Sequence, residues 1–243
     1  MNLQIEHHGA VTLFVIDNPA RRNAISQATA LALQQAFAEF DESDQRVAVI
    51  TGRGDEAFTA GADLNDVPEF WRCTPGIGIE TDKPIIAATA GWCIGGGITL
   101  VAMSDLAVAA DNTRFSYPEG RVGLTQGFIA GLAARIPQKI AMELILLGRT
   151  IDARRAYEAG LVNDVVPVGQ QVTAALDMAS RLAGHAPLVL RALKRFVRQT
   201  LPCSPAEAAI RTSQMISAIG ASEDFAEGRR AMREGRAPEF RGR

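Results

Sequence analysis

Three consecutive glycines near the middle of the chain are the first feature that indicates chemistry. Gly95, Gly96 and Gly97 lie between an apolar run over residues 85–89 and a stretch expected to begin a helix. A backbone without Cβ atoms can approach a ligand closely, at a cost in conformational entropy. Free N–H groups and the dipole at a helix N-terminus favour negative charge. The run therefore predicts either a ligand-binding turn or a turn that packs a strand tightly on a helix.

A second turn of small residues has similar potential. Residues 57–64 read Ala-Phe-Thr-Ala-Gly-Ala-Asp-Leu and follow an apolar run over residues 47–51. Asp63 suits the first turn of a following helix, where its charge meets the helix dipole. Taken alone, the segment is more typical of a simple capped loop than of a binding site.

The two turns together are more informative than either alone. Both follow expected core strands, at one edge of a parallel sheet, where ligand crevices form. Backbone N–H groups near Ala62 and Gly96 that converge on one oxygen would form an oxyanion hole. The loss of one such donor costs about 2.7–4 kcal/mol of transition-state stabilisation. We therefore predict an enzyme that holds a carbonyl oxygen against these two groups.

The elements that must position these turns follow from apolar patterning. Residues 3–7 and 10–16 indicate a hairpin that turns at Gly9, and residues 27–40 indicate a helix with Ser26 as its N-cap. Three further runs are expected to be strands buried on both faces, over residues 47–51, 85–89 and 106–110, and a short strand is expected at 114–117. Strands that alternate with helices predict an α/β fold with mostly parallel strands.

The C-terminal part of the chain is predicted to be helical. A last strand over residues 161–166 precedes four expected helices, separated by prolines and glycines, over residues 168–183, 187–200, 205–219 and 222–234. We expect this helical part to pack on a neighbouring subunit.

The composition limits the possible classes of function. The chain has 243 residues, 47% of them hydrophobic, and a formal net charge of −2, which argues against a nucleic-acid partner. Cys73, Cys93 and Cys203 are far apart, so neither a disulfide framework nor a metal site is expected, and a reducing cytoplasm fits. The sequence has no signal-peptide pattern and no run of about 18 apolar residues. We expect a soluble, cytoplasmic protein with no membrane partner.

Further motifs lie before, between and after the two turns along the chain. They are Asn18-Pro19 with Asn23-Ala24, Lys83–Ala88 leading into Gly91, Phe115–Glu119 with Gly123 and Gly127, Leu147–Arg149 with Ala159–Val162, and the ending Glu227–Met232. Together the motifs span about residues 10–240. In this order and spacing, the chain resembles the crotonase family, also called the enoyl-CoA hydratase/isomerase family.

The resemblance implies a crotonase-like spiral of ββα units and a coenzyme A thioester substrate, with no permanently bound cofactor. It divides the chain into an α/β core over residues 1–184 and a helical region over residues 185–243 that builds homotrimers or hexamers. The N–H groups of Ala62 and Gly96 would bind the thioester oxygen as it gains enolate charge. Residues that would contact the substrate are Arg21, Arg22, Ala24, Ala60, Asp63, Leu64, Gly95, Thr99 and Gln126.

The same resemblance assigns the proton-transfer chemistry to Glu119, which matches the family's second catalytic carboxylate. A carboxylate beside an apolar pocket has a raised pKa and suits acid–base work near neutral pH. Thr99 stands at the place of the other hydratase carboxylate, and a threonine cannot ionise near neutral pH. One carboxylate can still move a proton between two carbons. This departure from the family pattern at Thr99 therefore favours an isomerase, which shifts a double bond from the 3- to the 2-position, over the hydratase that the resemblance alone suggests.

Two departures from the family pattern concern the pocket. Gln126 precedes Gly127 where the family usually has proline, and its side chain is expected to reach the pocket. The short interval from residue 66 to 80 carries Glu69 and Glu80, which are weaker candidates for the missing carboxylate. It also carries Phe70 and Trp71, which are expected to line the pocket or simply to pack.

Other classes of function stay open on the sequence alone. The enzyme could be a hydratase that uses one carboxylate, or the protein could bind acyl-CoA without turnover. A dinucleotide site is a remote alternative, because Leu100 stands where the G-x-G-x-x-G pattern needs its third glycine. Cys93 has no nearby histidine in the sequence to activate it, and we expect it to be a buried apolar residue.

Overall fold

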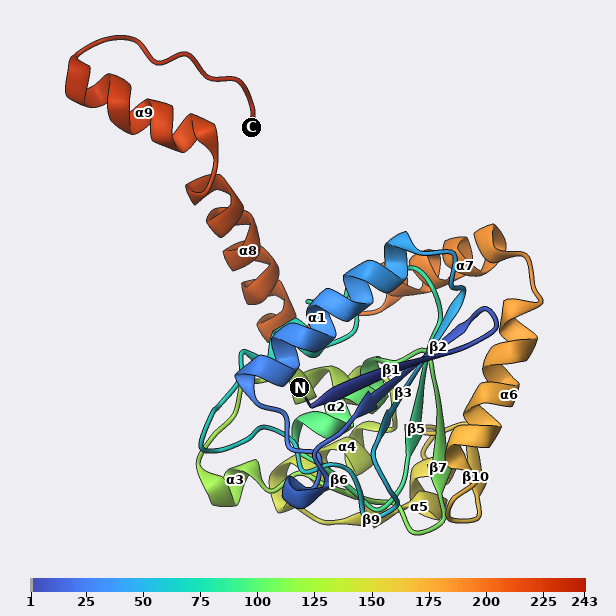
Figure 1. Ribbon diagram of the computed structural model, residues 1–243. Helices are drawn as coiled ribbons and strands as arrows, with labels where there is room; N and C mark the ends of the chain where they lie inside the picture. The colour runs from blue at the N-terminus through green and yellow to red at the C-terminus, as the bar shows by residue number, and fades with distance from the viewer. Residues whose placement is uncertain (1) are drawn as a thin grey trace. The chain divides into compact units, whose positions relative to one another are not determined.

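The computed structural model describes residues 2–243, which form two compact units, one that reaches to Cys203 and one that comprises Ser204–Arg243. The first unit contains two β-sheets (Figure 1). The larger sheet has six strands in the order β1 (Leu3–His8), β2 (Val11–Ile16), β3 (Val47–Gly52), β5 (Ile85–Thr89), β7 (Leu106–Ala110) and β10 (Asp164–Val166). The strand pair β1–β2 is antiparallel and the other pairs are parallel, so the predicted α/β class is confirmed.

The predicted hairpin and core strands lie close to their expected positions. The hairpin turns at Gly9, which has a φ of 62°, and residues 85–89 and 106–110 are strands over the whole predicted range. The last strand, β10, begins at Asp164 rather than at residue 161, so its predicted start was wrong. Leu161 and Val162 are buried against the body of the unit without being part of a strand, which is why their apolar side chains suggested one.

A second sheet of four short strands was largely missing from the prediction. It has the order β4 (Ala57–Thr59), β6 (Trp92–Ile94), β8 (Arg114–Ser116) and β9 (Ile151–Asp152). Strands β4, β6 and β8 are parallel, and β9 is antiparallel to β8. The two glycine-containing turns therefore follow β4 and β6, and do not follow the core strands β3 and β5 directly.

Helices cover the larger sheet. Helix α1 (Gln27–Glu42) begins at its predicted N-cap, since the Ser26 hydroxyl accepts a hydrogen bond from the Thr29 N–H. The ring of Phe37 in this helix stacks on Phe14 with 4.1 Å between centroids. Helix α6 (Gln171–Ala183) packs across β3, β5 and β7 (Figure 1), and its Ala175 and Ala179 are buried in that core.

Four shorter helices complete the α/β part of this unit. They are α2 (Gly96–Met103), α3 (Glu119–Val122), α4 (Gln138–Leu147) and α5 (Ala153–Glu158), with 3-10 turns η1 (Pro19–Arg21), η2 (Phe70–Cys73) and η3 (Phe128–Ala134).

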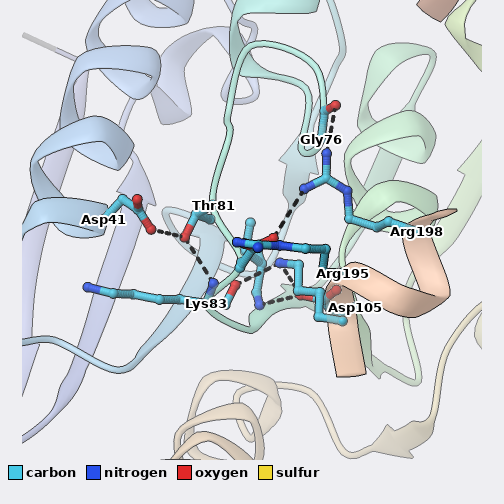
Figure 2. Close-up of polar contacts among 10 residues, drawn as sticks. Asp41, Gly76, Thr81, Lys83, Asp105, Arg195 and Arg198 are labelled. Carbon is cyan, nitrogen blue, oxygen red and sulfur yellow. Dashed lines mark hydrogen bonds and ion pairs between the residues drawn. The ribbon is translucent and has the colours of Figure 1, made fainter. Parts of the chain in front are cut away.

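Polar contacts tie helix α7 (Pro187–Thr200) to the rest of the first unit (Figure 2). Lys194 Nζ lies 2.7 Å from an Asp105 carboxylate oxygen, and Arg195 pairs with Asp82. Arg198 donates to the Gly76 carbonyl at 3.2 Å. Helix α7 therefore lies in the compact unit that reaches to Cys203, and the predicted oligomerisation region over residues 185–243 spans parts of both units and stays a prediction.

The second unit consists of α8 (Pro205–Gly220) and α9 (Glu223–Glu234) with a C-terminal extension. A capping box between Ser204 and Glu207 begins α8. Glu227 of α9 accepts a hydrogen bond of 2.6 Å from Arg236 and also pairs with Arg230, which fixes the chain after α9 onto the helix.

Candidate active site

The turn after β4 exposes one backbone donor. A parallel bridge joins Ala62 to Ile25: the Ile25 N–H donates to the Gly61 carbonyl, and the Asp63 N–H donates to the Ile25 carbonyl, both at 2.8 Å. In a parallel bridge, the residue between the two bonded neighbours directs its own N–H to the opposite side. The Ala62 N–H therefore points away from Ile25.

The turn after β6 supplies the second donor. Gly96 is the first residue of α2, and the first N–H groups of a helix have no intrahelical acceptor. The two turns are in backbone contact, because a Cβ built on Gly61 would lie 3.5 Å from the Gly96 nitrogen and 2.7 Å from the Ile94 oxygen. Within residues 2–243, neither the Ala62 nor the Gly96 N–H has a hydrogen-bond acceptor.

A carboxylate lies beside this second turn. Glu119 begins α3, and a Cβ built on Gly95 would lie 2.4 Å from Glu119 Oε1. Only glycine leaves room for the carboxylate at this position, and Gly95 also has a φ of 57°. Glu119 Oε2 is buried without a hydrogen-bond partner in the structure. Burial raises the pKa of Glu119 from 4.5 to about 7, so this group can accept and return a proton near neutral pH.

One small cavity, of about 60 Å³, brings the predicted reactive groups together. Ala62, Gly96, Thr99, Glu119 and Gln126 all line it, and its wall is completed mainly by aromatic and aliphatic side chains. Thr99 is buried in the second turn of α2. Among the described residues that line the cavity, Glu119 is the one carboxylate. The arrangement combines two N–H donors for an oxygen with a single acid–base group.

Six other predicted contact residues lie in or beside the first turn. Arg21 donates to Asp63 across 2.6 Å, and the Ala60 N–H donates to the Arg22 carbonyl. Arg22 is exposed, as is Leu64. Ala24 is buried, and none of these residues borders the cavity. Their contact with a substrate stays a prediction.

The positions of Glu69, Glu80 and Cys93 argue against a catalytic role for these three side chains. Glu69 is exposed and pairs with Arg72, whose hydrogen bond lowers the pKa of this carboxyl, and Glu80 is exposed as well. Neither borders the cavity. Cys93 is buried, and burial raises the pKa of its thiol well above 9, as expected for a structural cysteine.

The two aromatic residues of the interval 66–80 differ in their relation to the cavity. Phe70 lines the cavity, whereas Trp71 is covered by the Arg72 guanidinium on the outside, 4.5 Å from the ring centroid. Tyr117 was missed as a lining residue. Its hydroxyl lies 3.1 Å from Thr125 Oγ1, and burial raises its pKa, with a smaller contribution from the Glu119 charge. Its place two residues before Glu119, after a short strand, was the available signal.

No cluster of three or more His, Cys, Asp or Glu side chains in residues 2–243 could hold a metal ion. No helix among these residues has the length and apolar character needed to cross a bilayer.

Comparisons with known proteins agree over nearly the whole chain. Residues 6–70 and 79–243 match the family described as Enoyl-CoA hydratase/isomerase. The chain is similar to a carnitinyl-CoA dehydratase of Salmonella typhi, at 33% identity over 100% of this chain and 99% of the relative. It is also similar to a 2,3-dehydroadipyl-CoA hydratase of Escherichia coli K12, at 33% identity over 99% of each.

Solved structures show the same likeness. An enoyl-CoA hydratase from Mycobacterium tuberculosis H37Rv has a TM-score of 0.77 at 32% identity, and a carnitinyl-CoA hydratase from Mycobacterium avium has a TM-score of 0.76 at 34% identity. Each comparison covers 100% of this chain and 99% of the other.

Proposed function

This chain belongs to the enoyl-CoA hydratase/isomerase family, and on that premise we propose that it moves a double bond in an enoyl-CoA thioester from the 3- to the 2-position. The N–H groups of Ala62 and Gly96 bind the thioester oxygen. Glu119 takes a proton from C2, and the electrons of that C–H bond pass to the oxygen to form a dienolate. Glu119 then returns the proton to C4 as the double bond forms between C2 and C3.

The observation that carries this proposal is the single carboxylate in the cavity. Glu119 has a partnerless buried oxygen, while Thr99 lines the same cavity where a hydratase would place its other acid. A proton shuttle between two carbons needs only one group that changes its protonation state. Hydration of an enoyl-CoA ordinarily uses two carboxylates. The presence of only one in this cavity therefore favours isomerisation.

A direct assay tests the reaction. We expect a 3-enoyl-CoA to gain the ultraviolet absorbance of a conjugated thioester, and a 2-enoyl-CoA of equal length to lose it much more slowly. The Thr99→Val variant, which keeps the shape without the hydroxyl, serves as a control and should retain isomerisation. Rapid hydration of the 2-enoyl substrate without isomerisation of the 3-enoyl substrate would overturn the proposal.

Hydration is the second candidate function, because the curated relatives are named a carnitinyl-CoA dehydratase and a dehydroadipyl-CoA hydratase. In that reaction Glu119 would activate a water held by the Thr99 hydroxyl. Thr99→Val would then abolish turnover, in contrast to its expected effect on isomerisation.

The pH dependence of turnover follows from Glu119. Its carboxylate form must be present to take the proton, and this form is lost as the pH falls through about 7. We expect kcat/KM, measured at constant ionic strength, to fall by about tenfold per pH unit well below this value and to level off above it. An inflection near 4.5 would show that the group is not desolvated in the free enzyme.

The family also motivates two broader proposals. Arg21 and Arg22 would meet the phosphates of CoA beside the first turn, and Arg21 would then exchange its ion pair with Asp63 for a phosphate. The second proposal concerns assembly: homotrimers or hexamers would form through residues 185–243. In support, α7 exposes Leu188, Val189 and Phe196, each with more than half of its surface accessible in the single chain.

A further inference from the structure

We propose that Phe70 limits the acyl group to a short chain, and that Gln126 is a positioning residue that holds Phe70 in place. The inference rests on the proposed binding of an acyl-CoA thioester at Ala62 and Gly96. It adds a limit on the size of the acyl group at that site. The Phe70 ring sets this limit, and the hydrogen bonds of the Gln126 side chain hold the ring in position.

The ring of Phe70 stands directly against the second donor. A Cβ built on Gly96 would lie 2.2 Å from Phe70 Cζ and within 2.6 Å of both Cε atoms, so the tip of the ring touches the Gly96 backbone. Phe70 is buried, with 3% of its surface accessible. An acyl chain attached to a carbonyl at Gly96 must therefore pass this ring or stop at it.

The side chain of Gln126 fixes the backbone on both sides of Glu69. Its Oε1 accepts a hydrogen bond from the Phe70 N–H at 3.1 Å, and its Nε2 donates to the Pro68 carbonyl at 2.8 Å. The amide thus satisfies one donor and one acceptor of a segment more than 50 residues away in sequence. Gln126 lines the cavity, but both polar atoms of its side chain are bonded to this loop, so its contact with a substrate stays a prediction.

Helix α1 holds the opposite side of the same segment. The Glu69 N–H donates to Gln27 Oε1 at 2.7 Å, and Arg72 donates to Gln34 Oε1 at 3.0 Å. Phe70 therefore lies between anchors on α1 and on residue 126. The ring cannot leave Gly96 by motion of the backbone unless hydrogen bonds on one side break.

The space left beside the ring is small. The cavity measures about 60 Å³, against roughly 150 Å³ for a cavity that accepts benzene and about 300–1,000 Å³ for common ligand sites. Phe128 and Ile129 are buried in its wall and close it further. The proposed limit is therefore that this space accepts a four-carbon acyl group and excludes a ten-carbon one.

Binding of saturated acyl-CoAs tests the size limit without requiring turnover. Calorimetric Kd values for butyryl-CoA and decanoyl-CoA give a selectivity ratio for the wild type, Phe70→Ala, Gln126→Met and the double variant. Trp71→Ala is the matched control, since it removes a neighbouring aromatic ring that does not border the cavity. One methylene changes discrimination in a pocket by about 10–200-fold.

We expect the wild type to favour butyryl-CoA by at least about 100-fold, and Phe70→Ala to reduce this ratio by at least about tenfold while Trp71→Ala leaves it unchanged. Gln126→Met should reduce the ratio in the wild type and have no further effect on it in Phe70→Ala, because Gln126 acts through Phe70. A residue that only stabilises the fold would not give this non-additive pattern.

The outcomes separate the size limit from the proposed function. Equal affinity of the wild type for both chain lengths, or an unchanged ratio in Phe70→Ala, overturns the role of Phe70. An equal additional effect of Gln126→Met in both backgrounds overturns the positioning role. Selective binding without turnover of any enoyl-CoA would remove the proposed reaction and keep the size limit, whereas absence of any acyl-CoA binding would remove both.

Discussion

Replacement of Glu119 by glutamine is expected to lower kcat on an enoyl-CoA substrate by about 10²–10⁴-fold, with little change in substrate affinity. The amide has nearly the shape of the carboxyl group but cannot accept the C2 proton. Oε2 of the carboxylate is buried and Oε1 lies against Gly95, so the glutamine side chain would fill the same space. Single-turnover kinetics with saturating 3-enoyl-CoA would measure the chemical step directly.

The same variant is expected to be more stable than the wild type above pH 7. Burial raises the pKa of Glu119 in the folded state above its ordinary value of 4.5, so the folded protein binds this proton more tightly than the unfolded chain does. The contribution to stability is therefore full below pH 4.5 and is lost as the pH rises through about 7. Glutamine cannot ionise and avoids this loss.

Thermal unfolding at pH 5 and pH 8 provides the control for that prediction. The difference in Tm between Glu119→Gln and the wild type should be larger at pH 8. A variant that is inactive and also less stable at pH 8 would indicate a disrupted fold, and full activity of a well-folded variant would exclude Glu119 as the acid–base group.

The sequence was sufficient for the elements whose signals are local. The strands at 85–89 and 106–110 are continuous apolar runs, and helix α7 has a proline at its start and a clear apolar face. These signals need no knowledge of neighbours. The whole-chain motif order then identified the family, which the comparisons confirm.

The second sheet could not be derived in the same way. Strands β4 and β6 have three residues each, too few for a periodic pattern. They are defined by their pairing with each other and with β8, over separations of more than 20 residues. The turns were therefore found, while the strands that position them were not.

The hydrogen bond that holds the cavity wall in place was the other feature beyond local reasoning. Phe70 and Gln126 are 56 residues apart, and nothing in either segment indicates that the amide of one bonds the backbone of the other. The acids Glu69 and Glu80 had the right chemistry but lie on the solvent side of the loop. Residue type alone does not show which side of a loop faces a pocket.

Removal of the Gly96 N–H is expected to lower kcat by about 10²–10³-fold, the usual effect of losing one oxyanion donor. Proline at position 96 removes this donor and suits the first position of a helix, where its fixed φ is compatible. Any Cβ at this position would collide with the Phe70 ring. The test therefore compares Gly96→Pro with Gly96→Ala, both in a Phe70→Ala background that removes the ring.

The alanine variant is the matched control, since it adds the same Cβ and keeps the N–H. Both double variants should bind butyryl-CoA and unfold at similar temperatures, so that a difference in kcat reports the donor alone. Equal kcat values would show that Gly96 does not bind the developing charge, and the oxygen would then depend on Ala62. A large difference would mean that the glycine is needed twice, because its N–H stabilises the enolate and its missing side chain admits the ring that bounds the acyl group.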